Sequence, residues 1–390
     1  MRVALFTDTF LPDVNGVAKT LGRWVRYLES RGVVCRVFAP AAGEAGTLGI
    51  RSVERFYSIP FSLYPDCRMA IPNPLLVGRM LKEFRPTLIH LATPFNLGLT
   101  GLHYGKKHRI PLVASYHTHF DQYLTHYRLQ WMEPMLWKYL LWFHQNCVKV
   151  YVPSPSTGRI LHTKGLTGIE LWGRGIDTAE FRPHTDRRKV LNKHNLLPGK
   201  FVLLYVGRLA PEKGLDALVR AFASLPEAFR AKCALILAGD GPMRAELEKR
   251  LAPYPDVRFC GFVEGRELAE LYAAADVFVF PSASETFGNV VLEAMASGTA
   301  VVGVNAGGVA DNVRHGYTGL LCPPDDASAL AAEVQRLYEA PELRRKLALE
   351  GRSQALTRSW DSIFATLYES YREVAGDAGG GARRAAGTVK

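Results

Sequence analysis

Two glutamates in an apolar setting are the residues best suited to chemistry in this chain. Glu285 and Glu293 are separated by seven residues within PSASETFGNVVLEAMASG, residues 281–298. An unpartnered carboxylate among apolar neighbours is costly, so we expect both to face a ligand. At these positions Glu285 can hold sugar hydroxyls or stabilise positive charge on a sugar ring, and Glu293 can accept both hydroxyls of a ribose.

The backbone between these glutamates is a second candidate binding element. The spacing predicts that Glu285 lies in a loop and that a helix opens at Gly288, Asn289 and Val290, with Glu293 on its early turns. The first N–H groups of a helix have no partner within the helix and favour anions. We therefore expect the N–H groups from Phe287 to Val290 to bind a phosphate.

Two basic residues follow another strand-like segment. Arg208 and Lys213 lie in VGRLAPEKGLDALVRAF, residues 206–222, between an expected strand and an expected helix. Arginine offers a planar fork to phosphate oxygens and lysine a point charge. Solvation at the surface would explain either residue alone, but together they could neutralise a diphosphate. Such a pair could stabilise a departing nucleoside diphosphate with no metal ion, so we expect no metal site and no cofactor.

The first half of the chain has candidates of its own. Gly16 follows Asn15 at the start of a helical pattern, where glycine lets the backbone approach an anion. A plain turn between strand and helix is the alternative. His117 and His119 directly follow an apolar strand, and a histidine there can bond a sugar hydroxyl or manage a proton. A structural histidine explains them equally well.

The elements that must position these residues alternate along the chain. Apolar runs of strand length, such as 3–8, 87–92, 201–207 and 277–282, are separated by amphipathic segments of helical length. Continuous apolar strands with helices between them indicate parallel sheets covered on both faces. The predicted fold class is therefore α/β, with two doubly wound Rossmann-like domains facing each other across a cleft. Ligands of such sheets bind beyond the carboxyl ends of the strands, which is where the candidates lie.

The predicted domains follow from where this alternation is interrupted. We expect an amino-terminal domain over residues 1–180 and a second domain over 181–357. A helix over 358–375 is expected to cross back to the first domain. Residues 376–390 are rich in glycine and alanine and lack core-forming residues, so they are predicted to be a disordered tail.

Charge and composition restrict the partners and the compartment. Residues 1–185 contain 22 Lys and Arg against 12 Asp and Glu, whereas the rest of the chain is nearly balanced. This asymmetry suggests an anionic partner for the first half. No recognition helix, zinc finger or RNA-binding pattern is evident, so we expect no nucleic acid. Single scattered cysteines and an amino terminus that reads as a strand rather than a signal peptide favour the cytoplasm.

An aromatic segment at 122–147 leaves two interpretations open. It combines tryptophans and tyrosines with His126, Arg128 and Lys138. It is either an amphipathic element that lies on an anionic membrane surface, at the inner face of the membrane, or a helix buried against the first sheet.

At these motifs the chain resembles the retaining glycosyltransferases of family 4, which have the GT-B architecture. The resemblance covers about residues 1–375 and rests on ETFGNVVLEAMASG, GRLAPEKG and NAGGVADNV. It implies that residues 1–180 bind the acceptor and residues 181–357 the nucleotide sugar, and that Gly16, Arg208 and Lys213 approach the donor diphosphate. It also implies that Glu285 contacts the donor sugar and Glu293 the ribose, and that His117 lies near the reacting sugar.

The resemblance further implies transfer of a hexose from a nucleoside diphosphate to an acceptor hydroxyl, with the α configuration kept and no metal ion required. SYHTHFDQY and LWGRGIDTAEFRP are similar to segments of two subgroups, and GDP-mannose-dependent α-mannosyltransferases with lipid acceptors are the favoured one. Sulfoquinovosyl- and glucosyltransferases of glycolipids, which use UDP-sugars, are the alternative. Sulfoquinovosyltransferases have LWNKGVD where this chain has LWGRGID, residues 171–177, which weakens the inference of a particular donor.

The base of the nucleotide is expected to contact the loop CGFVEGR, residues 260–266, around Phe262 and Val263, mostly through backbone groups.

Two other classes of protein remain as alternatives to a glycosyltransferase. A nucleotide-sugar epimerase can share the architecture but should lack the combined motifs. A non-catalytic binding protein would bind the nucleotide without transfer.

Overall fold

The structure, a computed structural model, describes every residue except 14, 42–51, 61–67, 118–129 and 386–390. The chain forms two compact units. The first comprises Met1–Gly173 together with Asp361–Lys390, and the second comprises Arg174–Trp360. The predicted boundary after residue 180 thus lies inside the second unit, because Ile176, which precedes that boundary, is already buried in the core of the second unit.

A parallel sheet of seven strands forms the centre of the first unit, in the order β3-β2-β1-β6-β7-β8-β9. Its strands are β1 (Arg2–Phe6), β2 (Val34–Pro40), β3 (Val53–Phe56), β6 (Leu88–Leu91), β7 (Leu112–Ser115), β8 (Lys149–Val152) and β9 (Ile169–Leu171). A separate antiparallel pair consists of β4 (Ser58–Pro60) and β5 (Arg68–Ala70). The central strands are buried along their length, as a sheet covered on both faces requires.

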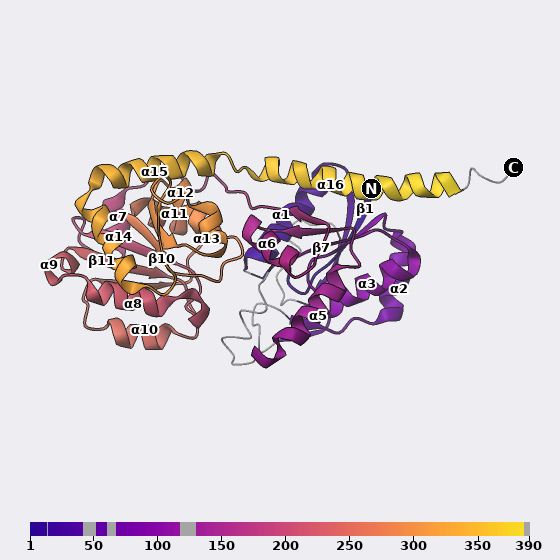
Figure 1. Ribbon diagram of the computed structural model, residues 1–390, viewed down its shortest axis with the longest axis horizontal. Helices are drawn as coiled ribbons and strands as arrows, with labels where there is room; N and C mark the ends of the chain where they lie inside the picture. Colours follow the sequence, from indigo (N-terminus) through magenta and orange to yellow (C-terminus); the bar gives the residue numbers. More distant parts are fainter. Residues whose placement is uncertain (14, 42–51, 61–67, 118–129, 386–390) are drawn as a thin grey trace. The chain divides into compact units, whose positions relative to one another are not determined.

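Helices lie on both faces of this sheet (Figure 1). They are α1 (Gly16–Ser30), α2 (Pro74–Phe84), α3 (Asn96–His108), α5 (Glu133–His144) and α6 (Pro155–Thr163), with a 3₁₀ turn η1 (Gln130–Met132). Asn15 and Asn73 cap α1 and α2, and the side chain of each accepts a hydrogen bond from the backbone of the first turn.

The second unit has a parallel sheet of six strands in the order β12-β11-β10-β13-β14-β15. Its strands are β10 (Phe201–Val206), β11 (Cys233–Ala238), β12 (Val257–Gly261), β13 (Val277–Phe280), β14 (Ala300–Val304) and β15 (Leu320–Cys322). The structure therefore confirms the predicted fold class of two parallel-sheet α/β domains.

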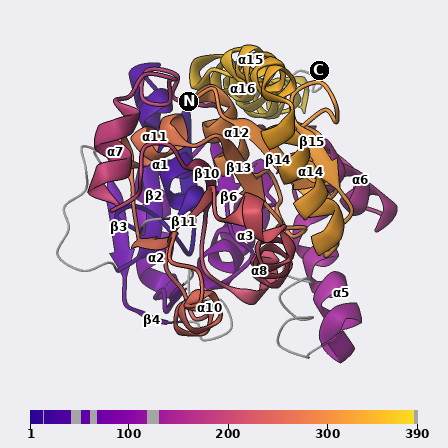
Figure 2. The same cartoon turned by 90° about the vertical axis from the view of Figure 1, so that its left-hand side faces the viewer.

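Helices surround this second sheet as well (Figures 1 and 2). They are α7 (Arg187–Lys193), α8 (Leu215–Ser224), α9 (Glu227–Arg230), α10 (Arg244–Leu251), α11 (Gly265–Ala274), α12 (Asn289–Ala296), α13 (Gly307–Asn312), α14 (Ala327–Glu339) and α15 (Pro341–Leu356), with a 3₁₀ turn η2 (Pro211–Lys213).

Each sheet reverses its strand order at one place. In the first sheet the reversal lies between β1 and β6, and in the second between β10 and β13. Loops after two such strands diverge to opposite faces and leave a crevice, which is the usual ligand site of this fold. The loops after β10 and β13 contain Arg208, Lys213 and Glu285, so the topology alone brings these predicted residues to one place.

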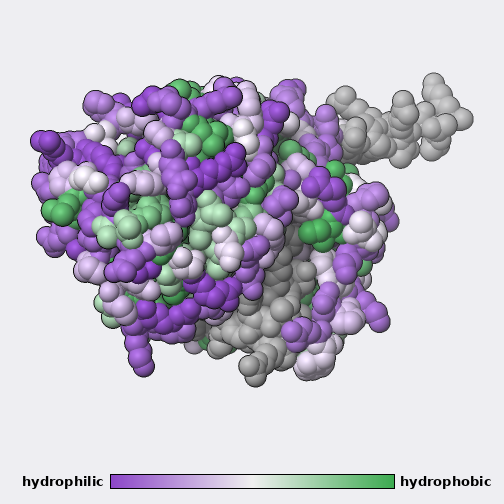
Figure 3. Space-filling model, turned by 60° about the vertical axis from the view of Figure 1, so that its left-hand side comes forward, coloured by the Kyte–Doolittle hydropathy of each residue, from purple (hydrophilic) through white to green (hydrophobic). Residues whose placement is uncertain are grey.

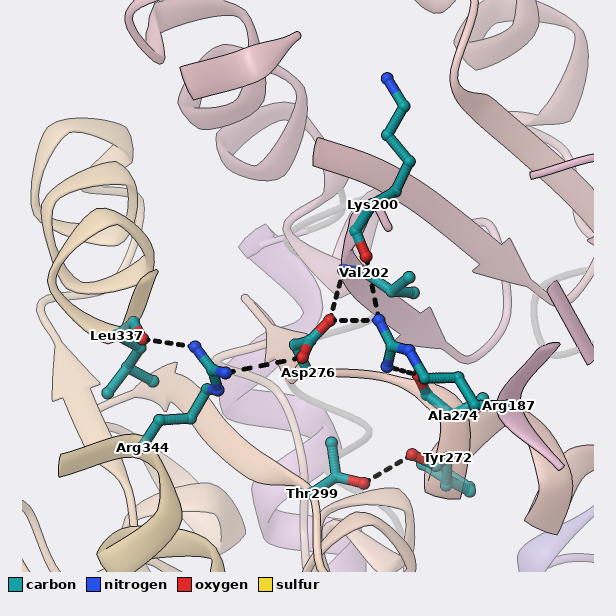
Figure 4. Close-up of polar contacts among 9 residues, drawn as sticks. All are labelled: Arg187, Lys200, Val202, Tyr272, Ala274, Asp276, Thr299, Leu337 and Arg344. Atoms are coloured by element: carbon teal, nitrogen blue, oxygen red, sulfur yellow. Dashed lines mark hydrogen bonds and ion pairs between the residues drawn. The ribbon is translucent and has the colours of Figure 1, made fainter. Parts of the chain in front are cut away.

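At the amino ends of the strands of the second sheet, opposite the loops that carry these residues, Asp276 precedes β13 and forms a polar network (Figure 4). One of its carboxylate oxygens accepts hydrogen bonds from Arg187 Nη2 at 2.7 Å and from the Val202 N–H at 2.8 Å. Arg344 Nη2 lies 3.7 Å from the other oxygen, and its Nη1 donates to the Leu337 carbonyl. This network ties three helices to the amino ends of the strands, away from the loops that concern us.

The last helix, α16 (Trp360–Ala385), belongs almost entirely to the first unit. Its end at Ala385 corrects the prediction that residues 376–390 are a disordered tail; residues 386–390 lie outside the described part. Residue preference does not explain this continuation, because four of residues 376–385 are glycines and each costs about 1 kcal/mol relative to alanine within a helix.

Large exposed apolar side chains are distributed unevenly. In the first unit they include Tyr57, Ile71, Leu75, Trp131 and Met135, which are exposed by at least half. The face of the second unit drawn in Figure 3 is mostly hydrophilic, with hydrophobic residues in small separate groups. Within the described residues, no helix is long and apolar enough to cross a membrane.

Candidate functional site

The loops after β10 and β13 are in direct contact. Ser284 Oγ donates a hydrogen bond of 2.8 Å to the Glu212 carbonyl. Gly214 has a φ of +68°, and a Cβ atom there would lie 2.4 Å from the Pro281 carbonyl oxygen. Only glycine permits this approach, so the short GRLAPEKG loop packs directly on the loop that leads to Glu285.

Two ion pairs lie where these loops meet. Lys213 Nζ contacts Glu285 Oε1, and Arg208 Nη2 contacts Glu212 Oε1. The four side chains are between 9 and 25% exposed, so solvent screens the pairs only partly. Each cation is thus held in place by a carboxylate, and an anionic ligand would have to share or replace that carboxylate.

A buried tyrosine, Tyr205, contacts the backbone of the loop that carries these ion pairs. The Tyr205 hydroxyl donates to the Arg208 carbonyl at 3.0 Å. Burial raises the pKa of Tyr205 well above 10, and the charge of Glu285 adds to this effect. Neither Tyr205 nor Glu212 is among the residues predicted from the sequence. Glu212 lies four residues after Arg208, but Arg208 is in a loop and not on a helix, so the spacing alone did not predict the pair.

Glu293 is placed on α12, as predicted, and has a protein partner. The Tyr272 hydroxyl donates to Glu293 Oε2 at 3.0 Å. Thr299 Oγ1 in turn donates to the Tyr272 carbonyl at 2.6 Å, and Figure 4 shows these two residues together. Burial raises the pKa of Tyr272 well above 10, so the phenol stays a donor and orients the carboxylate.

The helix α12 begins between Glu285 and Glu293, at the residues where the sequence predicts its start. Gly288 caps α12 with a φ of +81°, and Phe287 before it is buried. The Gly308 N–H donates to the Glu285 carbonyl at 2.8 Å. A Cβ atom on Gly308 would lie 2.4 Å from the Phe287 backbone. The start of α13 therefore packs directly on the backbone from Glu285 to Phe287 and fixes its course.

Phe262 and Val263 directly follow β12. Phe262 is 61% exposed, whereas Val263 packs on the core of the unit. The Gly239 N–H donates to the Gly261 carbonyl at 2.7 Å, which joins the ends of β11 and β12 just before Phe262. An exposed aromatic ring beside a strand end is suited to stack on a flat ligand, although backbone groups were predicted to make most of the contacts.

The remaining candidates belong to the first unit. Gly16 begins α1, and Asn15 Oδ1 accepts a hydrogen bond of 2.8 Å from the Ala18 N–H. His117 follows β7, and its ring meets Trp172 edge to face at 5.4 Å between centroids. His119 lies outside the described residues. The structure thus brings together Arg208, Lys213 and Glu285, while Gly16 and His117 are in the other unit.

One buried acid of the first unit was not predicted. Asp8 follows β1 at the reversal of strand order and is 0% exposed. Thr93 Oγ1 donates to Asp8 Oδ2 at 2.6 Å, yet burial raises the pKa of Asp8 to about 7. Its position at the end of VALFTD, directly after an apolar strand, was the available signal. Among the described residues, no cluster of three or more His, Cys, Asp or Glu is arranged to hold a metal ion.

Two family models match most of the chain between them. The family described as Glycosyl transferases group 1 matches residues 186–354, and the one described as Glycosyltransferase Family 4 matches residues 14–180. A GDP-mannose-dependent alpha-mannosyltransferase of Mycobacterium tuberculosis is 33% identical over 96% of this chain and 97% of its own. The sulfoquinovosyl transferase SQD2 of Arabidopsis thaliana is 32% identical over 92% of this chain and 71% of its own.

Solved structures agree with the fold. Anabaena Alr3699/HepE in complex with UDP and glucose matches with a TM-score of 0.78, covering 96% of this chain and 100% of that one, at 22% identity. Sucrose-phosphate synthase of Thermosynechococcus elongatus matches with a TM-score of 0.77 over 96% of this chain and 99% of its own, at 25% identity.

Proposed function

The chain belongs to the family 4 glycosyltransferases and is an enzyme of that class, and from this premise we propose that it is a retaining, GDP-mannose-dependent α-mannosyltransferase with a lipid or glycolipid acceptor. The observation that supports the proposal most directly is the contact between Lys213 and Glu285 beside Arg208, at the reversal of strand order. Full-length similarity to mannosyltransferases of this name supports the choice of donor.

The proposed donor site uses the geometry of the second unit. Arg208 and Lys213 bind the diphosphate together with the N–H groups at the start of α12. Glu293, oriented by Tyr272, accepts the ribose hydroxyls. The base lies against Phe262 and Val263. From the first unit, Gly16 approaches the diphosphate and His117 positions the sugar.

The proposed reaction is a displacement on one face of the sugar. The acceptor oxygen forms a bond to the anomeric carbon on the face from which the phosphate leaves, and the bond from that carbon to the phosphate oxygen breaks. The departing phosphate takes the acceptor's proton, so atoms and charge balance. Arg208 and Lys213 stabilise the negative charge that develops on the leaving group, which is why we propose that no metal ion is required.

A UDP-sugar glycolipid transferase is the second candidate. It is favoured by the similarity to SQD2 and by an alpha-monoglucosyldiacylglycerol synthase of Streptococcus pneumoniae, which is 32% identical over 77% of this chain and 70% of its own. Both candidates share the diphosphate site and differ in the base and the sugar.

An anionic membrane surface is the proposed meeting place with the acceptor. Trp131, Met135 and Trp142 recur at helical spacing on η1 and α5 and are 75, 58 and 49% exposed. Lys138 lies within the same turns and the first half of the chain is strongly basic. This supports a cytoplasmic enzyme bound peripherally at the inner face of the membrane.

The test combines a donor panel with one substitution. Hydrolysis and transfer are measured with GDP-mannose, UDP-glucose, UDP-galactose and UDP-sulfoquinovose, and we expect turnover with GDP-mannose. Lys213→Ala should abolish transfer while circular dichroism shows the fold intact. Turnover by one of the UDP-sugars instead would favour the second candidate, and full activity of Lys213→Ala would refute the proposed mechanism.

A further inference from the structure

Asn312 is a buried polar residue that touches the backbone of the proposed donor site from behind. It is the last residue of α13 and is 1% exposed. Its Nδ2 donates a hydrogen bond to the Phe287 carbonyl, one residue before the cap of α12. Its Oδ1 accepts a hydrogen bond from Arg358 Nη1. None of the roles proposed above uses either residue.

The chemistry of the partners fixes the orientation of this amide. A guanidinium only donates hydrogen bonds and a carbonyl only accepts them. The oxygen of Asn312 must therefore face Arg358, and the nitrogen must face Phe287. No apolar or purely accepting side chain of similar size can satisfy both neighbours at once.

Arg358 links the contact between Asn312 and Phe287 to the segment that precedes α16. Its guanidinium lies 5.9 Å from the Phe287 ring centroid. Its carbonyl accepts a hydrogen bond of 3.0 Å from the Ile176 N–H, and Ile176 forms a parallel bridge with Ser359. The two segments that link the units thus run side by side at Arg358, two hydrogen bonds away from the Phe287 carbonyl.

We propose that Asn312 and Arg358 are positioning residues for donor binding. By holding the Phe287 carbonyl they orient the peptide that follows it, and with it the N–H groups that open α12 toward the diphosphate. Because Arg358 also holds Ile176, this orientation is coupled to the backbone of the two linking segments. The inference rests on the proposed donor site and adds to it two residues that do not touch the donor.

The experiment measures GDP binding by isothermal titration calorimetry, with UDP as the probe if the wild type binds only that nucleotide. Asn312→Leu is uncharged and close in size, so it removes both hydrogen bonds without changing the charge near the phosphates. We expect it to weaken GDP binding at least tenfold. Arg358→Gln should weaken binding several-fold, and Arg358→Lys should restore most of the loss. In kinetic assays the KM for the donor should rise with little change in the KM for the acceptor.

Arg344→Gln is the matched control. It makes the same chemical change as Arg358→Gln in a half-buried arginine of the same unit, and its partners Asp276 and Leu337 lie at the amino ends of the strands (Figure 4). It should lower the unfolding midpoint and leave GDP binding within twofold of the wild type.

The outcomes separate this inference from the proposed function. A wild type that binds neither GDP nor UDP overturns the proposed function and the inference with it. A wild type that binds, with Asn312→Leu or, if that variant does not fold, Arg358→Gln binding equally well, overturns the inference alone. Equal weakening by Arg344→Gln would also overturn it, because the effect would then reflect general stability.

Discussion

Arg208 and Lys213 each contact a carboxylate, so a diphosphate that enters the proposed site would replace one anionic partner of each cation by another. Holding two long side chains in place beforehand reduces the entropy lost on binding. The ion pairs have a second effect, because removing one partner leaves the other charge poorly compensated in a partly buried site. Substitutions here therefore affect binding and stability together, and controls must separate the two.

Tyr272 allows a substitution at the site that leaves every charge in place. Tyr272→Phe keeps the ring and removes the hydroxyl that orients Glu293. A hydrogen bond to a charged group contributes about 1.5–3 kcal/mol. We expect the KM for the donor to rise roughly tenfold or more with kcat little changed. Tyr338→Phe, whose ring packs on Phe201 and Phe229, is the control. An unchanged KM in Tyr272→Phe would show that the orientation of Glu293 does not matter for binding.

Asp8 makes stability depend on pH in an unusual direction. Its pKa in the folded protein is raised to about 7, whereas an unfolded aspartate has its ordinary value of 3.8. Between these values the folded state binds the extra proton, so the free energy of unfolding falls as pH rises from about 4 to 7. Linkage sets the maximum slope at roughly 1.4 kcal/mol per pH unit.

The isosteric substitution Asp8→Asn removes this dependence. We expect the variant to gain stability relative to the wild type with each step from pH 5 to pH 7, measured by urea unfolding. Asp361→Asn, at an exposed position of the same unit, should follow the wild-type profile. Parallel profiles for Asp8→Asn and the wild type would show that Asp8 is ionised throughout.

At the scale of elements, much of the arrangement was predictable. The strands expected at 201–207 and 277–282 begin where the structure has them and end within two residues of the observed ends, because a strand buried on both faces is an unbroken apolar run. The loop position of Glu285 and the helical position of Glu293 followed from the same reasoning. The site residues found only in the structure, Tyr205, Tyr272 and Asn312, lie inside strands or helices, where a polar atom is hard to distinguish from core.

The attachment of α16 to the first unit shows why contacts between distant elements escape such reasoning. The Tyr371 hydroxyl bonds His90 Nδ1 on β6 and accepts a hydrogen bond of 3.1 Å from Trp24 Nε1 on α1. These residues are far apart in the sequence, and nothing in their local patterns pairs them. An apolar periodicity predicted the helix, but the polar partners at its centre depend on the tertiary fold.

The hydrogen bonds of Tyr371 with His90 and Trp24 predict how much stability is lost when the Tyr371 hydroxyl is removed. Tyr371→Phe leaves a buried histidine nitrogen without its partner, and the penalty for such a group is about 1–3 kcal/mol. The free energy of unfolding, measured with urea, should fall by roughly that amount. Tyr368→Phe, on the same helix and only partly buried, should change it by less than about 0.5 kcal/mol. Equal effects would show that the buried network is not what attaches α16.

At the scale of the whole molecule, charge and exposed apolar surface are concentrated in the same half of the chain. Residues 1–185 contain nearly all of the net positive charge, and the exposed tryptophans Trp131 and Trp142 lie in the same half. Basic residues attract a protein to anionic lipid, and tryptophan side chains anchor it in the headgroup region. Neither property requires a membrane-spanning helix, so an enzyme of this kind would bind and leave the surface reversibly.

Flotation with vesicles tests this combination. The protein should float with phosphatidylglycerol vesicles at low salt and much less with phosphatidylcholine vesicles, and added salt should weaken the binding because it screens the charges. Replacing Trp131 and Trp142 together by serine should reduce flotation several-fold. Replacing Leu349 and Leu356 by serine is the matched control, because these second-unit residues are 65 and 47% exposed against 75 and 49% for the tryptophans. Equal loss in both double variants, or binding that ignores lipid charge, would mean that α5 is not the membrane-facing element.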